Sequence, residues 1–183
     1  ARGYIEKMQR SAAQMDDLIC DLLKYATIGR QDLERRPVSL DDALRAAQAM
    51  LESELRATGA RLTAPPALPV VIADPTLLQV VFQNLLSNAI KFVAPGVRPE
   101  VEIAAQALPG LVRVTFTDNG LGIPAEARAQ LFRIFERLHP EFSGTGIGLA
   151  IVHRAIERLG GRIGVEPAPN GRGSRFWIDL PAA

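Results

Sequence analysis

The sequence predicts an α/β two-layer sandwich, in which a mixed β-sheet packs on three helices and a long coiled-coil-like helix precedes the sandwich. Two observations favour this class. After an amphipathic N-terminal stretch, helical patterns alternate with short apolar runs that are separated by Gly- and Pro-containing turns. The 183 residues, of which 48% are hydrophobic, are enough for one compact domain with an extra arm but few for two domains.

The N-terminal stretch, residues 4–28, carries apolar side chains at alternating spacings of three and four, and Gly29 follows as a stop signal. Such a helix either packs on its own domain or forms half of a helical hairpin used for dimerisation. No helix of similar length is expected downstream, which favours the hairpin. Because the first residue is not Met, we also expect the chain to begin inside a larger protein.

Capping signals mark the starts of the next two helices. Ser39, with Asp42 three residues later, resembles a capping box. Asp74 as N-cap and Pro75 at the first helical position start another helix. The expected elements are a helix at 39–59, a strand at 70–73, a helix from 75 to about 92, strands at 101–106 and 111–118, helices after Pro124 and after Gly148, and strands at 162–166 and 174–180.

Charge and composition exclude several kinds of function. Lys and Arg number 21 against 20 Asp and Glu, so bulk charge argues neither for wrapping nucleic acid nor for binding an anionic membrane. Cys20 is the only cysteine, which excludes an intrachain disulfide and a four-cysteine zinc site. The only histidines, His139 and His153, argue against a multi-histidine metal centre. The longest apolar runs, such as residues 68–73, are far too short for a membrane span, and no signal peptide is visible.

One face of the helix expected at 75–92 is polar in an unusual way. Asn84, Ser87, Asn88 and Lys91 share this face at spacings of three and four. Asn is a poor helix former, and such local conflicts tend to mark function. An amide oxygen is a suitable Mg²⁺ ligand, and Lys91 can meet a phosphate from the same face. A polar but idle surface is the alternative interpretation.

The second motif surrounds Asp118, which ends an apolar row of one expected strand. A buried carboxylate needs a hydrogen-bond donor, and the exocyclic amino group of adenine is one. Gly120 and Gly122 would let the backbone come close to a flat base. A turn that Asp118 caps is the alternative.

The third motif is a glycine-rich run, residues 144–150, that opens a helix. Backbone N–H groups at such a helix N-terminus form a ready anion site. The run lacks the Gly-Lys-Ser/Thr of a P-loop, and no strand precedes it as a dinucleotide-binding fingerprint requires. A flexible glycine loop is the alternative.

Together and in this order, the motifs resemble the ATP-binding domain of sensor histidine kinases, within the superfamily that includes gyrase, Hsp90 and MutL. The segment Phe135–His139 and the short lid after it are similar to kinases attached to bacterial phytochromes and related light or PAS sensors. Residues 15–23 are similar to the second helix of that family's dimerisation hairpin. The motifs are an N box at 83–92, a G1 box at 118–124, an F box at 131–139, a G2 box at 144–150 and a last glycine motif at 171–174.

The resemblance implies ATP and Mg²⁺ as cofactors. It assigns Asn88 to the metal and Asn84, Lys91 and Arg137 to catalysis, with a lid over about 139–143. Arg137 would steady the γ-phosphate. The residues implied in ATP binding are Asn84, Asn88, Lys91, Asp118, Gly120, Gly122, Ile123, Arg137, Gly144, Thr145, Gly146, Ile147, Gly148, Leu149 and Ser174.

The implied reaction is transfer of the γ-phosphate to a histidine and onward to a response-regulator aspartate. Superfamily members that hydrolyse ATP carry a glutamate base four positions before the metal asparagine, where this chain has Asn84. Neither His139, which precedes Pro140, nor His153 suits the acceptor role. We therefore expect the acceptor helix to be absent, residues 1–29 to be the second hairpin helix, and residues 30–183 to be the ATP-binding catalytic domain that does not phosphorylate itself alone.

The implied partners are ATP, a response-regulator receiver domain and a second copy that dimerises through the hairpin in the full-length protein. The resemblance also implies a cytoplasmic location, no nucleic acid and no direct membrane contact from this segment. Three alternatives stay open. A related ATPase is disfavoured by Asn84, an anti-sigma-type serine kinase by the coiled-coil helix, and a degenerate kinase acting as a dimerising interaction module by the five intact motifs.

Overall fold

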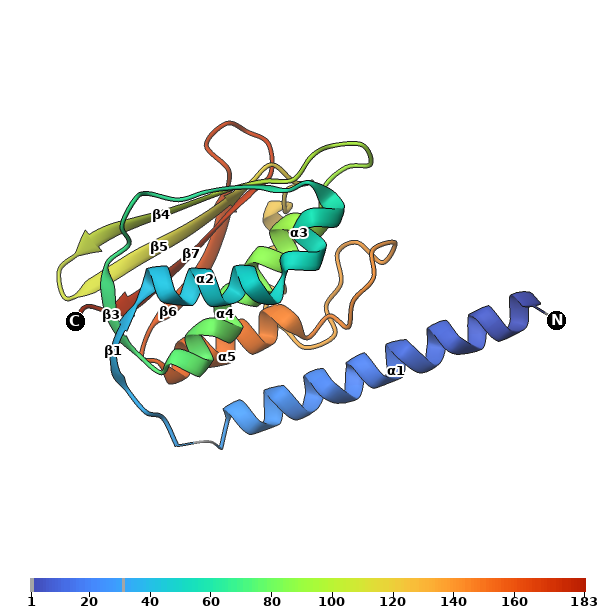
Figure 1. Ribbon diagram of the computed structural model, residues 1–183, viewed down its shortest axis with the longest axis horizontal. Coiled ribbons are helices and arrows are strands. Elements are labelled where there is room, and N and C mark those ends of the chain that lie inside the picture. Colours follow the sequence, from blue (N-terminus) through green and yellow to red (C-terminus); the bar gives the residue numbers. More distant parts are fainter. Residues whose placement is uncertain (1, 31) are drawn as a thin grey trace.

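The computed structural model describes residues 2–30 and 32–183 as a sheet layer, a helical layer and a projecting helix (Figure 1). Residue 1 of the expected segment 1–29 and residue 31 of the expected segment 30–183 lie outside the described residues. The elements are α1 (Arg2–Ile28), β1 (Arg36–Ser39), α2 (Leu40–Met50), α3 (Glu52–Thr58), β2 (Arg61–Thr63), β3 (Val70–Ala73), α4 (Pro75–Lys91), β4 (Glu100–Leu108), β5 (Leu111–Asp118), the 3-10 turn η1 (Ala125–Ala127), α5 (Gly148–Arg158), β6 (Arg162–Pro167) and β7 (Ser174–Pro181).

The main sheet has five strands in the order β2-β4-β5-β7-β6, and β1 and β3 form a separate antiparallel pair. β2 runs parallel to β4, whereas the other neighbours in the main sheet are antiparallel. Every second residue of β5 is buried, as strand alternation predicts. The buried positions are Val112, Val114, Phe116 and Asp118. The mixed sheet and the helices packed on it confirm the predicted fold class.

Helix α4 is the central element of the helical layer, since it packs on α2, on α5 and on the sheet. The ring of Phe82 meets the ring of Phe116 in β5 edge-on, with centroids 5.0 Å apart and planes at 87°. Both rings are fully buried. This contact fixes α4 on the centre of the sheet, and the polar face of the helix is left toward the 131–147 segment.

The expectations and the structure differ at four places. β1 and β2 were not predicted, because these short segments have no strand pattern of their own. They are strands because they pair with β3 and β4, respectively. The helix expected at 39–59 is divided at Leu51, whose buried side chain lies at the junction of α2 and α3. The helix expected after Pro124 is wrong. Only the turn η1 forms there, and it buries none of its residues, so no apolar face stabilises a longer helix.

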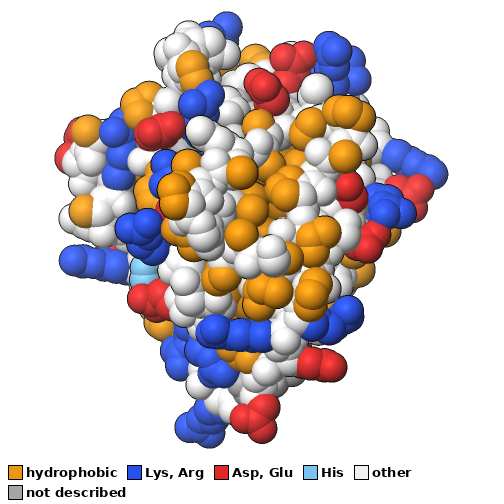
Figure 2. Space-filling view, turned by 90° about the vertical axis from the view of Figure 1, so that its left-hand side faces the viewer, with side chains coloured by type: hydrophobic (Ala, Val, Ile, Leu, Met, Phe, Trp, Pro, Cys, Tyr) orange, Lys and Arg blue, Asp and Glu red, His pale blue; other side chains and the backbone are white. Residues whose placement is uncertain are grey.

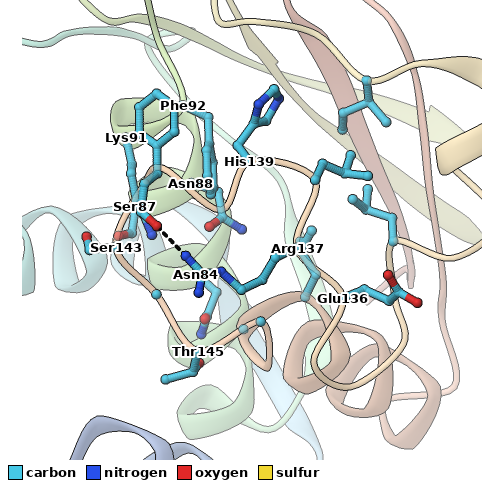
Figure 3. Close-up of a pocket in the computed structure, with 18 of the residues that line it drawn as sticks. Asn84, Ser87, Asn88, Lys91, Phe92, Glu136, Arg137, His139, Ser143 and Thr145 are labelled. Carbon is cyan, nitrogen blue, oxygen red and sulfur yellow. Dashed lines mark hydrogen bonds between the residues drawn. The ribbon is translucent and has the colours of Figure 1, made fainter. Parts of the chain in front are cut away.

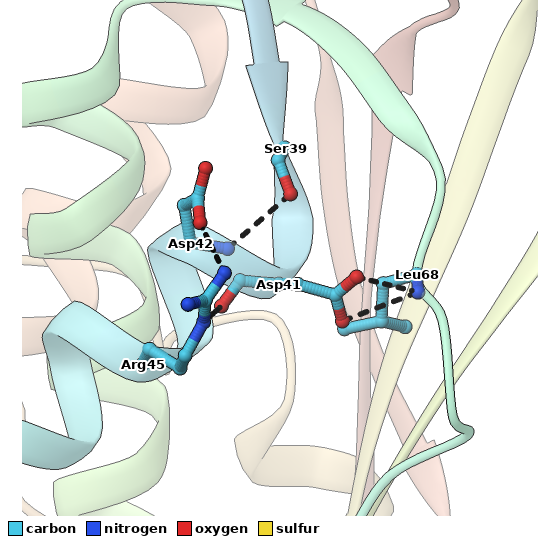
Figure 4. A network of polar contacts seen from close by, with 5 residues as sticks. All are labelled: Ser39, Asp41, Asp42, Arg45 and Leu68. Atoms are coloured by element: carbon cyan, nitrogen blue, oxygen red, sulfur yellow. Dashed lines mark hydrogen bonds and ion pairs between the residues drawn. The ribbon is translucent and has the colours of Figure 1, made fainter.

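Polar contacts tie the start of α2 to the loop that precedes β3 (Figure 4). Ser39 Oγ accepts a hydrogen bond from the N–H of Asp42 at 3.3 Å, as the predicted N-cap requires. The carboxylate of Asp41 accepts from the N–H of Leu68 at 3.2 and 3.1 Å. Arg45 pairs with Asp42. The proline-rich turn before β3 is therefore held against the first turn of α2.

The cap of α4 is buried and has more partners than the cap of α2. Asp74 is 5% exposed. Its Oδ1 accepts from the N–H groups of Thr76 and Leu77 at 2.9 and 3.1 Å, and its Oδ2 accepts from the N–H of Glu34 at 3.0 Å. The cap therefore also holds the segment between α1 and β1.

The substitution Asp74→Ala is expected to lower the free energy of unfolding by about 3 kcal/mol, because it removes a cap and leaves one buried and two part-buried N–H groups without their acceptor. The matched variant Ser39→Ala removes one exposed cap bond and is expected to cost about 1 kcal/mol. Urea denaturation of both variants measures the difference. Equal losses would show that the additional hydrogen bonds of Asp74 contribute nothing to stability.

The N-terminal half of α1 projects from the domain, whereas its C-terminal end lies beside α5 (Figure 1). Several large apolar side chains are exposed along α1: Ile5, Met8, Met15, Ile19 and Leu22 of the predicted stripe, and also Leu23. Ile28, at the end of the helix, is buried. No helix in the described part of the chain combines the length and the apolar content that crossing a bilayer requires.

Figure 2 shows the side of the molecule that lies at the left of Figure 1, where β1 and β3 pair. Hydrophobic side chains gather over the middle of this face, and both basic and acidic side chains lie around its margin. The two signs of charge are mixed there, in keeping with the formal net charge of +1.

Candidate functional site

A cavity of about 330 Å³ lies between α4, the end of β5, the 131–149 segment and the C-terminal half of α1. This volume is in the range of pockets that hold small ligands. It brings together residues from the three polar motifs of the sequence. The predicted site residues that line it are Asn84, Asn88, Lys91, Asp118, Gly122, Ile123, Arg137, Gly144, Thr145, Gly146, Gly148, Leu149 and Ser174.

Two predicted site residues, Gly120 and Ile147, do not line this cavity. Ile147 is fully buried in the core at the N-terminus of α5. The N–H of Gly120 donates to Asp118 Oδ1 at 2.9 Å, and a Cβ at Gly120 would overlap the carbonyl oxygen of Phe92. Both residues therefore support residues of the site without lining the cavity themselves.

The polar face of α4 forms one wall, and Figure 3 shows Asn84, Asn88 and Lys91 along it. The amide nitrogen of Asn84 donates to the carbonyl oxygen of Val80 at 2.8 Å, so its orientation is fixed by its own helix. Burial lowers the pKa of the Lys91 ammonium, and the nearby charge of Arg137 lowers it further, against a smaller opposite effect of Glu54. An anion bound beside Lys91 would stabilise its positive charge.

Asp118, the last residue of β5, also lines the cavity. Its Oδ1 accepts from the N–H groups of Gly120 and Ser174 at 2.9 and 3.1 Å. Burial raises the pKa of this carboxyl, and the two N–H donors partly oppose the shift. Since both bonds end on Oδ1, the other oxygen is the one available to an N–H donor on a ligand.

Glycines bring a second chain segment against Asp118. Gly173 has φ +85°, and a Cβ there would overlap the carbonyl oxygen of Asp118. Gly122 has φ +78°, and a Cβ there would lie 3.3 Å from the carbonyl oxygen of Gly173. This close approach of the 118–122 segment and Gly173 shapes the cavity wall around Asp118.

The glycine-rich run leads into the N-terminus of α5, which points at the cavity. Gly146 has φ +73°, and Ile147 precedes the helix without a side-chain cap. Thr145 Oγ1 accepts from the N–H of Ile147 at 3.3 Å. A Cβ at Gly148 would lie 2.8 Å from Asn84 Oδ1, so the helix start packs closely on α4. The positive end of the α5 dipole and Lys91 thus face one space, which suits an anion.

Arg137 reaches the cavity from the 131–139 segment (Figure 3). Its Nη2 donates to the carbonyl oxygens of Pro140 and Phe142 at 2.8 and 2.6 Å, so here it holds the lid together. The family resemblance implies a γ-phosphate role for this guanidinium. A phosphate near Lys91 would compete with the two carbonyl groups for it.

The lid carries an aromatic cluster that the sequence did not predict. The ring of Phe142 lies 5.4 Å from that of Phe92 and 6.0 Å from that of His139. His139 Nδ1 lies 3.1 Å from Oε1 of Glu141, while its Nε2 is buried without a hydrogen-bond partner among the described residues. All three rings line the cavity and add apolar surface to its wall. The second histidine, His153 of α5, does not line the cavity.

Four residues of α1 also line the cavity: Asp17, Cys20, Asp21 and Lys24. Sequence reasoning missed them, because the helical pattern shows which side of α1 is apolar but not where the helix docks. The side chains of Asp21 and Thr145, 124 positions apart, form a hydrogen bond of 2.6 Å.

The described residues contain no cluster of three or more His, Cys, Asp or Glu side chains that could hold a metal ion by itself. Asn88 supplies one amide oxygen at the cavity. Mg²⁺ commonly binds through one or two protein oxygens, the phosphates of its nucleotide and water. The residues present therefore fit a Mg²⁺ ion that arrives with a nucleotide.

Known proteins with similar sequences or structures agree with this geometry. A family model described as histidine kinase-, DNA gyrase B- and HSP90-like ATPase matches residues 73–183. Cyanobacterial phytochrome A of Nostoc sp. is 37% identical over 183 residues, covering 99% of this chain and 24% of the phytochrome. The chain thus spans about a quarter of the length of the curated relatives it matches.

Two solved structures share the fold. The crystal structure of full-length ShkA in complex with AMPPNP has a TM-score of 0.79 and 31% identity, and the match covers 100% of this chain and 39% of ShkA. The mycobacterial sensor histidine kinase MprB has a TM-score of 0.66 and 31% identity, and the match covers 80% of this chain and 97% of MprB.

Proposed function

This chain belongs to the family of histidine kinase-, DNA gyrase B- and HSP90-like ATPases, and from this premise we propose that it is the ATP-binding catalytic part of a sensor histidine kinase. It would bind ATP with Mg²⁺ and transfer the γ-phosphate to a histidine that lies outside residues 1–183. The phosphoryl group would then pass to an aspartate of a response regulator.

One observation carries the proposal: the three polar motifs line one cavity with complementary chemistry. Asp118 would offer an acceptor for the adenine amino group. Lys91 and the N-terminus of α5 line the same cavity, and phosphates would lie beside them. The complex of ShkA with an ATP analogue supports the same ligand class.

The residues favour phosphoryl transfer to an imidazole over hydrolysis by water. A histidine nitrogen would form a bond to the γ-phosphorus while the bond to the bridging oxygen of ADP breaks. Lys91 and Arg137 would neutralise charge that develops on the phosphoryl oxygens. Asn84 cannot remove a proton from water, and its amide nitrogen donates a hydrogen bond to the carbonyl oxygen of Val80. The related-ATPase alternative therefore has no general base at this position.

Mg²⁺ would be held by Asn88 and would supply charge neutralisation between the phosphates. Asn84, one helical turn away, would support the same face of the nucleotide. Gly144, Thr145 and Gly146 would approach the phosphates with their backbone N–H groups, under the lid over residues 139–143.

The remaining parts of the proposal concern the longer protein. Residues 1–29 would be the second helix of a dimerisation hairpin, and residues 30–183 the catalytic domain. The exposed apolar side chains of α1, among them Met8 and Met15, support a helical partner. We propose a homodimer, a receiver domain as phosphoryl acceptor, and a cytoplasmic location.

The purified chain is expected to bind a non-hydrolysable ATP analogue in the presence of Mg²⁺ but not to acquire acid-labile phosphate from ATP. The physical reason is that His139 lies in the lid outside any helix, with its Nε2 buried, and that His153 of α5 does not line the cavity. Isothermal titration calorimetry measures binding, and incubation with γ-labelled ATP measures transfer. Acid-labile label on the chain would contradict the missing acceptor, and absence of analogue binding would contradict the proposed function.

A further inference from the structure

The C-terminal half of α1 docks on the domain and closes one side of the nucleotide cavity. The guanidinium of Arg154 in α5 stacks on the ring of Tyr25 at 4.4 Å. Arg158 donates to the carbonyl oxygens of Ile28 and Gly29 at 3.0 and 2.7 Å. A Cβ at Gly29 would overlap the guanidinium of Arg154, so the chain passes α5 closely.

One polar contact extends this docking to the phosphate end of the cavity. Asp21 Oδ2 accepts a hydrogen bond of 2.6 Å from Thr145 Oγ1. Thr145 lies between Gly144 and Gly146, and its hydroxyl also accepts from the N–H of Ile147 at the start of α5. A carboxylate of the arm therefore occupies the rim of the space in which a phosphate would meet the same loop.

The charges around this contact favour exchange of one anion for another. Asp17 and Asp21 both line the cavity, and of the cavity's basic side chains Lys24 pairs with Asp21 at 3.7 Å. Lys91 and the N-terminus of α5 attract anions, whether carboxylate or phosphate. A triphosphate would bring several more negative charges into the cavity that Asp17 and Asp21 line, and like charges repel each other.

We propose that the docked arm and the triphosphate of ATP compete for the phosphate loop, with Asp21 as the intramolecular competitor. Docking of α1 lowers the affinity for ATP. Bound ATP lowers the equilibrium constant for docking of α1 on Thr145 by the same factor, because coupling between two binding events is reciprocal. This inference rests on the proposed ATP site and adds a regulatory contact to it. A signal that moved α1 in the longer protein would thereby change nucleotide affinity.

Three substitutions in α1 separate the effect of the contact from that of charge alone. Asp21→Ala removes the carboxylate and the acceptor, whereas Asp21→Asn removes the charge and keeps an acceptor for Thr145. Asp16→Asn is the matched control, since Asp16 is exposed on the same helix and does not line the cavity. Calorimetric titration with an ATP analogue and Mg²⁺ is expected to show binding about fivefold tighter or more for Asp21→Ala. We expect a smaller gain for Asp21→Asn and no change for Asp16→Asn.

Amide hydrogen exchange gives a second readout that does not depend on affinity. A saturating concentration of analogue is expected to speed exchange in residues 18–28 of the unsubstituted chain. In the Asp21→Ala variant, exchange in the same residues is expected to be fast even without nucleotide. Exchange in α4 shows that each variant stays folded. Weaker or unchanged analogue binding by Asp21→Ala would overturn the proposal, as would slower exchange of residues 18–28 with analogue.

The two proposals fail in distinguishable ways. If the unsubstituted chain and Asp21→Ala both fail to bind the analogue, the proposed function is wrong. If both bind it with equal affinity, the ATP site stands and the competition by Asp21 is wrong.

Discussion

Replacing Asp118 with asparagine is expected to weaken binding of the ATP analogue by about 100-fold, equivalent to about 3 kcal/mol. The asparagine oxygen can still accept the N–H groups of Gly120 and Ser174, which Asp118 Oδ1 accepts at 2.9 and 3.1 Å. Its amide N–H₂ would then face the adenine amino group, so two donors would oppose each other. The loss therefore arises at the ligand rather than in the fold, and calorimetric titration measures it.

The pH dependence provides a control for this substitution. Burial raises the pKa of Asp118, so in the unsubstituted chain the affinity for the analogue is expected to fall as the pH drops through that raised value. The contribution of Asp118 to the free energy of unfolding changes in the opposite direction. It declines as the pH rises from the ordinary aspartate pKa to the raised one, because the native state holds the proton more tightly. Asp118→Asn is expected to lack both changes.

An Asp118→Asn variant that binds the analogue as tightly as the unsubstituted chain would contradict adenine recognition by this carboxylate. A useful comparison ligand is the GTP analogue, which presents a carbonyl oxygen where adenine presents its amino group. The variant is expected to lose less affinity for it than for the ATP analogue, since the asparagine N–H₂ can donate to that oxygen.

Replacing Gly173 with alanine is expected to lower the free energy of unfolding by about 3 to 5 kcal/mol, because backbone must move to admit the methyl group. Its Cβ would overlap the carbonyl oxygen of Asp118 and lie 2.8 Å from Asp118 Oδ1, at φ +85°. The end of β5 and the cavity wall around Asp118 would both be displaced. Urea denaturation measures the loss, and analogue titration of the folded fraction should show weakened binding.

The chain offers a matched control two residues earlier. Gly171 has a similar φ of +73°, but a Cβ there would meet nothing within 4 Å. Gly171→Ala is therefore expected to cost about 1 kcal/mol, which is the penalty of the left-handed backbone alone. Equal losses for the two variants would mean that the contact of Gly173 with Asp118 does not limit stability.

Local signals were sufficient wherever a few adjacent residues specify the geometry. Asp74 followed by Pro75 predicted the start of α4, and the structure shows the cap bonds to Thr76 and Leu77. The alternation along β5 predicted that Asp118 ends a buried row, and it is 8% exposed. The spacing of Asn84, Asn88 and Lys91 predicted one shared face, and all three line the cavity.

Local signals failed where distant partners decide the conformation. β1 and β2 are strands because β3 and β4 pair with them. The segment after Pro124 has a helical sequence pattern, but η1 buries none of its residues and only this one turn forms. The hydrogen bonds of Arg137 to Pro140 and Phe142 depend on how the lid folds back, which motif spacing does not reveal.

By itself, the sequence determined the fold class, the polar face of α4, the buried position of Asp118 and the glycine-rich start of α5. Each depends on the periodicity of a helix or strand or on a short turn. Only the tertiary structure decided that α1 closes the cavity and that Asp21 meets Thr145. These residues are 124 positions apart, and no local periodicity relates them. Their contact depends on the docking of Tyr25 and Ile28 beside α5, which packing and hydrogen bonding across the whole domain select.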